Sequence, residues 1–231
     1  MHHVVLERWS RGRSPLHARD ARVKIIALAA FLIGLATLTR LPPSLLAGYA
    51  ALLMMGILFS GLPPYGVLVR SLVILPFSGV FALVSWFAGD AGRAVLLIEK
   101  SYLSALAVML VVGTTPFPAL MAAFESLGAP RFLVLVIQFL YRYLFVISEQ
   151  AQHRRVAASC RAGSGLRLLF QAAAGAVAVL FARSYERAEG IHRAMIARGF
   201  EGHFALAAPR GLAWADFLLA IVVIASTVAL R

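Results

Sequence analysis

The sequence predicts an all-α integral membrane protein with about five transmembrane helices, and two observations carry this prediction. First, 61% of the 231 residues are hydrophobic and only 14% are charged, whereas a soluble domain holds about 45–50% apolar and about 25% charged residues. Second, the apolar residues fall into separate runs, each long enough to cross a bilayer as a helix. This surplus exceeds what a buried core can hold, so the bilayer must solvate part of the chain.

The first four runs predict four transmembrane helices. They lie at residues 23–39, 44–60, 67–87 and 94–115, with turns rich in proline, glycine or polar residues between them. Asp20 is placed to cap the first helix, because its side-chain oxygen can accept hydrogen bonds from free backbone N–H groups. Pro76 lies inside the third run, where it must kink the helix or rely on a neighbouring helix to satisfy the freed carbonyl.

The sequence changes in character after Pro116. A short amphipathic helix is expected at 117–127, followed by two long helices at about 131–163 and 166–199, each apolar at first and charged later. Such helices fit neither lipid nor water along their whole length, so we expect them to slant out of the membrane. A last span is expected at 213–230.

The arginines predict which side of the membrane each part faces. The first 24 residues carry six Lys and Arg residues, and residues 131–210 carry eleven arginines against four glutamates. Because basic loops stay in the cytoplasm, the N-terminus and the long helices are expected inside and the C-terminus outside. The predicted domains are a cytoplasmic basic leader (1–22), a four-helix membrane region (23–115), a cytoplasmic helical region (116–210) and a last membrane helix (211–231).

The second long helix carries a face of small residues that includes Ala174, Gly175 and Ala178. Small side chains let another helix backbone approach closely, which favours this face as the point where the two long helices cross. The alternative is that the alanines serve only as good helix formers.

The end of the same helix is the strongest candidate for contact with a partner. Arg198 follows Ala197 and precedes Gly199, a residue suited to cap the helix. The arginine offers a permanently charged fork to carboxylates or carbonyls of another protein. The alternative is that it only interacts with its own helix dipole and with solvent.

Several function classes find little support in the sequence. No glycine-rich phosphate loop is present, so the chain is not expected to bind ATP, and its histidines and single cysteine share no metal-site spacing. The net charge of +12 is compatible with a nucleic-acid tether, but membrane topology explains the same basic residues better. A membrane-embedded enzyme would need ionisable groups converging at one depth, and those in the apolar runs are few and scattered.

Several motifs together resemble a known family. They are Ser14-Pro15-Leu16-His17, Thr114-Thr115-Pro116-Phe117-Pro118, Leu127-Gly128-Ala129-Pro130-Arg131, Tyr141-Arg142-Tyr143 and Ala194-Met195-Ile196-Ala197-Arg198-Gly199-Phe200. They resemble the T component, the transmembrane scaffold of energy-coupling-factor transporters, in its cobalt/nickel branch. The family's first arginine motif is matched by Cys160-Arg161-Ala162-Gly163, with Arg155 as the alternative position.

The resemblance implies a non-catalytic subunit of an ATP-driven importer in the bacterial cytoplasmic membrane. It implies that the two long helices cross as an X, and that Arg161 and the Ala197-Arg198-Gly199 end dock on two ATP-binding-cassette ATPases. It further implies a substrate-binding membrane S component, with room for a small accessory membrane subunit. ATP is then bound by the ATPases and cobalt or nickel by the S component, so this chain needs no cofactor. A scaffold serving a vitamin S component and a membrane-embedded enzyme remain the alternatives.

Overall fold

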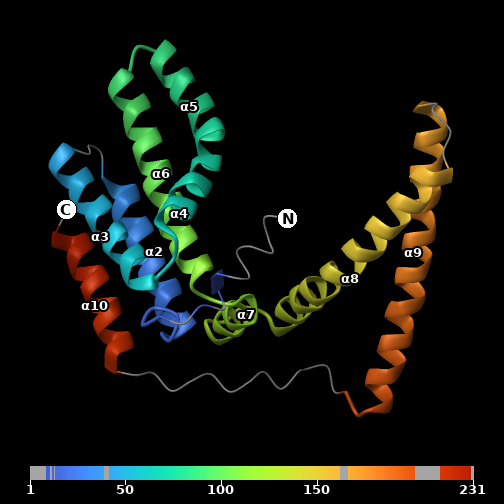
Figure 1. Cartoon of the computed structure of the whole chain (residues 1–231). Coiled ribbons are helices and arrows are strands. Elements are labelled where there is room, and N and C mark those ends of the chain that lie inside the picture. The colour runs from blue at the N-terminus through green and yellow to red at the C-terminus, as the bar shows by residue number, and fades with distance from the viewer. Residues whose placement is uncertain are drawn as a thin grey trace. The chain divides into compact units, whose positions relative to one another are not determined.

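A computed structural model describes residues 9–10, 12, 14–38, 42–161, 166–200 and 214–229. No β-strand occurs in these residues, so the predicted all-α class is confirmed (Figure 1). The helices, in chain order, are α2 (Ala21–Thr37), α3 (Pro43–Ser60), α4 (Pro64–Ser71), the 3₁₀ turn η1 (Leu72–Ile74), α5 (Leu75–Phe87), α6 (Ala91–Gly113), α7 (Phe117–Ser126), α8 (Arg131–Arg161), α9 (Leu166–Ala197) and α10 (Trp214–Ala229).

Within the described residues, four helical segments are long and apolar enough to cross a membrane. They are Pro43–Ser60, Pro64–Phe87, Ala91–Gly113 and Arg131–His153. The first three coincide with predicted spans, and the fourth is the apolar part of the first long helix. The other two predicted spans correspond to α2 and α10, helices of 17 and 16 residues, which are slightly shorter than a typical membrane-spanning helix of about 20 residues.

Local sequence rules account for several helix boundaries. Asp20 accepts a hydrogen bond from the Arg22 backbone N–H at 2.8 Å, which confirms the predicted cap of α2. Pro76 has no N–H group, and its ring would clash with the carbonyl of the residue four positions earlier. The helix is interrupted at that point by η1, and α5 restarts with the proline in its first turn.

The chain divides into two compact units. The first comprises Met1–Leu127 with Ala208–Arg231, and the second comprises Gly128–Ala207. The first unit therefore contains α2 to α7 and α10, with α5 and α6 forming a helical hairpin (Figure 1). The short helix α7 contacts α2 in this unit.

The core of the first unit lies where α2, α3 and α6 meet. Phe31 and Tyr49 pack edge to face with ring centroids 5.5 Å apart, and Ile57 and Leu103 are buried beside them. Many other large apolar side chains of this unit are exposed. An exposed apolar surface of this extent fits a protein whose outer faces are solvated by lipid.

The leader is attached to α4 through Trp9. The guanidinium carbon of Arg70 lies 4.3 Å from the centre of the Trp9 ring, a cation–π geometry. His17 Nε2 lies 2.9 Å from the Trp9 carbonyl oxygen. Gly66 leaves space for the indole, since a Cβ there would lie 2.9 Å from the ring. Arg70 thus stacks on the leader, a contact that no local pattern could indicate.

Lys24 connects the beginning of α2 to the end of α6. Its Nζ donates to the Thr114 carbonyl at 3.0 Å and to Thr115 Oγ1 at 3.1 Å. The side chain is buried, so these bonds satisfy an ammonium group that would otherwise be costly to desolvate. The cation also lies beside the carboxyl end of α6, where the helix dipole favours positive charge.

Lys100 makes the reciprocal connection, from α6 to the end of α2. Its Nζ donates to the Ala36 carbonyl at 3.1 Å and also to the Leu38 carbonyl. Carbonyls at the end of a helix have no partner within the helix. The chain contains only these two lysines among its 22 basic residues, and each one binds the carboxyl end of the other's helix.

We expect Lys24→Met and Lys100→Met each to lower the free energy of unfolding by about 1–3 kcal/mol, because each removes charge-assisted bonds to helix-end carbonyls. Lys24→Arg should not restore stability, since a planar guanidinium does not replace a compact ammonium in a buried site. Thermal unfolding in detergent measures both effects. Arg93→Met, at an exposed arginine of the same unit, is the control. Equal midpoints for Lys24→Met and this control would contradict the prediction.

Candidate coupling site

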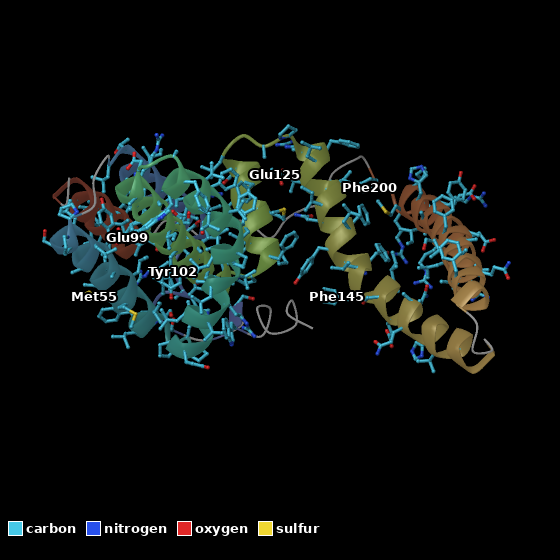
Figure 2. The ribbon with its side chains drawn as sticks, turned by 90° about the horizontal axis from the view of Figure 1, so that it is seen from above. Met55, Glu99, Tyr102, Glu125, Phe145 and Phe200 are labelled. Atoms are coloured by element: carbon cyan, nitrogen blue, oxygen red, sulfur yellow. The ribbon has the colours of Figure 1, made fainter. Side chains whose placement is uncertain are left out.

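The second unit consists of the two long helices. They run in opposite directions and contact each other (Figure 1). A cavity of about 510 Å³ lies between the apolar first half of α8 and the polar second half of α9. Phe139 and Tyr143 line it from α8, and Ile191, Met195 and Phe200 line it from the other side. Figure 2 labels Phe145 on α8 and Phe200 just beyond the end of α9.

At the end of α9, backbone N–H groups donate to carbonyls of the last helical turn. Gly199 has a φ of 76°, in the left-handed region where a side chain would be strained. Its N–H donates to the Ile196 carbonyl at 2.9 Å, and the Phe200 N–H donates to the Met195 carbonyl at 3.0 Å. This pair of bonds is the Schellman motif, which satisfies carbonyls that the helix leaves free. The predicted glycine cap is therefore present.

Arg198 stands between the last helical residue, Ala197, and the capping glycine. All three residues are exposed. Among the described residues, no hydrogen bond or ion pair involves the Arg198 side chain. One turn earlier, Arg193 is paired with Glu189 on the same helix. The helix end thus presents one exposed guanidinium on a backbone held rigid by the cap, a geometry suited to a carboxylate or carbonyl of another chain.

A comparison with protein families covers most of the molecule. The family model CbiQ, described as "Cobalt transport protein", matches residues 12–206. The chain belongs to the CbiQ family. Its matched region includes both long helices and the arginine at the end of α9.

Individual relatives of this CbiQ-family chain come from an archaeon and a bacterium. Uncharacterized protein MJ1089 of Methanocaldococcus jannaschii is 30% identical over 62% of this chain and 58% of its own length. Uncharacterized protein MJ1571 of the same organism is 23% identical over 86% of this chain and 76% of its own length. Nickel permease LarQ of Lactiplantibacillus plantarum is 26% identical over 64% of this chain and 54% of its own length. The chain thus spans little more than half of two of these relatives.

The first arginine motif lies at the edge of the described residues of this CbiQ-family chain. Arg161 is the last residue of α8. Its side chain and that of Arg155 are outside the described part, as are residues 162–165. The role of Arg161 therefore stays a prediction.

No described residue outside α9 covers the small face of this helix at Gly175. Ala174 and Ala178 line a shallow groove on α9 between Phe170 and Phe181. At Gly175 an added Cβ would have no heavy atom within 4 Å, counting the described residues outside the helix's own backbone and its chain neighbours. The residues that α8 and α9 share around their cavity lie further along α9. Crossing at the small face stays a prediction.

Two residues of the quoted motif at the end of α9 had no predicted role in the site. Met195 and Phe200 line the cavity between the long helices and are joined by the last bond of the Schellman motif. A hydrophobic residue directly after a capping glycine often contacts the last turn of its helix. That spacing, present here in Gly199-Phe200, is the signal that could have identified them.

A metal ion in a protein requires a group of ligand side chains. In the part of the chain that the structure describes, no three His, Cys, Asp or Glu residues are grouped so as to hold a metal ion. This finding concerns residues 14–38, 42–161, 166–200 and 214–229 and the few described positions before them.

Proposed function

We propose that this CbiQ-family protein is the transmembrane coupling subunit of an energy-coupling-factor importer for a transition metal, cobalt or nickel. It links two ATP-binding-cassette ATPases to a membrane S component that binds the substrate. ATP is bound by the ATPases and metal by the S component, and this chain performs no catalysis. The observation that carries the proposal is the exposed Arg198, which has no side-chain partner among the described residues, on the rigidly capped end of a 32-residue helix.

The family and one relative support metal as the substrate. The matching model is described as a cobalt transport protein, and one relative bears the name nickel permease. A coupling subunit needs an apolar part for the membrane and a charged part for soluble partners. The chain has both, because α8 contains an apolar segment long enough to cross a membrane and the second half of α9 is polar.

The test is co-expression with candidate ATPases and S component, followed by purification through a tag on this chain. We expect two ATPase subunits and one small membrane protein to co-purify, and the complex in vesicles to take up cobalt or nickel only with ATP. Turnover of a substrate by this chain alone would support a membrane enzyme. Uptake of a vitamin in place of metal would support the alternative S component.

We place the protein in the bacterial cytoplasmic membrane as a multi-pass protein with a cytoplasmic N-terminus. This topology predicts that a cysteine at position 190, in a Cys160→Ser background, is not labelled by an impermeant maleimide in intact cells. Gly190 is exposed, and no heavy atom of the described residues, apart from the helix's own backbone and the chain neighbours, lies within 4 Å of an added Cβ. Gly92→Cys, in the first turn of α6 and expected outside, is the matched control and should be labelled. The reverse pattern would contradict the arginine-based topology.

A further inference from the structure

An apolar groove of about 390 Å³ lies in the first unit between α2, α3, α6 and α10. Its volume is in the range of small-molecule binding sites, about 300–1,000 Å³. The floor is formed partly by small residues, Ala27 and Ala107, which are buried. Its rim is formed by large apolar side chains that are exposed, among them Met55, Phe59 and Leu218. Figure 2 shows Met55 on the outer side of α3.

One end of the groove is cationic. Arg19 and Lys24 line it there, together with Pro15 and Leu16 of the leader. Arg19 Nη1 lies 3.9 Å from Asp216 Oδ1, and the arginine side chain keeps 26% of its surface exposed. Lys24 has its donors directed at α6.

The groove lining at this end is cationic. Arg19 and Lys24 line the groove, whereas the two carboxylates near them, Asp20 and Asp216, do not. The Asp20 backbone N–H lies 3.4 Å from Asp216 Oδ1, so the first turns of α2 and α10 lie together there. Helix N-termini carry positive partial charge.

We propose that this groove binds an anionic phospholipid of the surrounding bilayer. One acyl chain lies along the apolar walls from Leu28 towards Phe31 and Leu52, and the phosphate lies at the exposed face of Arg19. Basic pockets between transmembrane helices bind anionic headgroups in this way. The apolar rim and the single cationic end match the two halves of such a lipid, and this role is separate from ATPase coupling.

The test is native mass spectrometry of the whole chain, purified in detergent and incubated with one of two lipids. The lipids are phosphatidylglycerol and phosphatidylcholine with identical palmitoyl and oleoyl chains. We expect the wild-type protein to retain phosphatidylglycerol at least fivefold more than phosphatidylcholine. Equal retention would overturn the proposal and would leave a helix of a membrane partner as the occupant.

Substitutions locate the retained lipid. Arg19→Gln should remove at least four-fifths of the retained phosphatidylglycerol, whereas Arg19→Lys should preserve it. Arg93→Gln, at an exposed arginine away from the groove, should leave it unchanged. Wild-type retention by Arg19→Gln would overturn the proposal.

A second pair of changes fills the groove itself. Ala27→Leu should lower retention of both lipids, and Ala51→Leu, at an exposed position of α3 outside the groove, should not. Val222→Trp, at the exposed rim on α10, gives the same test if Ala27→Leu unfolds the chain. Undiminished lipid retention in a folded groove-filling variant would overturn the location.

Discussion

Arg198→Glu is expected to leave the protein folded and inserted while lowering ATPase recovery at least tenfold. The guanidinium makes no hydrogen bond or ion pair within the described chain, so its removal breaks no such internal contact. At an interface, however, the change replaces a cation with an anion facing groups that would bind the cation, and like-charge contacts oppose association. A tenfold loss corresponds to only about 1.4 kcal/mol of binding free energy. Pull-down of the ATPase through tagged protein measures the effect.

Further variants test whether the loss of ATPase recovery comes from the charge and shape of the Arg198 side chain. Arg198→Lys keeps the charge but loses the planar fork, so recovery between those of wild type and Arg198→Glu is expected. Arg183→Glu changes the charge of another exposed arginine of α9 and is the matched control. Combining Arg198→Glu with Arg161→Glu should abolish assembly with both ATPases. Wild-type recovery in that double variant would contradict the proposed docking.

Gly175→Leu is expected to spare ATPase binding but to uncouple ATP hydrolysis from metal uptake. The described part of the chain leaves space for the new side chain, because none of its heavy atoms outside the helix's own backbone and the chain neighbours lies within 4 Å of a Cβ at this position. Leucine is also a better helix former than glycine, by about 1 kcal/mol. A transport defect would therefore arise in the assembled and working complex, where the small face is predicted to meet another helix.

Gly190→Leu is the matched control for the small face, since it lies on the same helix and is equally open. Ala174→Phe extends the test to a neighbouring position of that face. Metal transported per ATP hydrolysed, measured in vesicles, is the relevant quantity. A wild-type ratio in both small-face variants would mean that the alanines serve helix propensity alone.

Local features of this fold could be predicted from the sequence because their causes lie within a few residues. Asp20 and Gly199 act on the helix turn beside them, and Pro76 interrupts its own helix. The contacts of the two lysines could not be predicted in this way. Lys100 reaches carbonyls more than sixty residues earlier in the chain, and Lys24 reaches Thr114, ninety residues later.

In the candidate site too, features with local causes could be predicted and contacts between distant residues could not. The exposure and cap of Arg198 follow from local sequence, whereas Met195 and Phe200 enter the site through the packing of α8 against α9. Arg70 illustrates the limit for charged groups in apolar runs. Arg70 stacks on Trp9 of the leader and Lys100 binds the end of α2, and both contacts join residues far apart in the chain.

The Schellman motif at the tip of α9 uses the backbone N–H donors that a docking partner could otherwise bind. The N–H groups of Arg198, Gly199 and Phe200 are all bonded to carbonyls of the last turn. If the tip docks as proposed, it can therefore enter and leave a partner's groove without breaking these backbone hydrogen bonds. Because these N–H groups are already bonded, we expect the Arg198 side chain to be the main donor that the tip offers to the proposed partner.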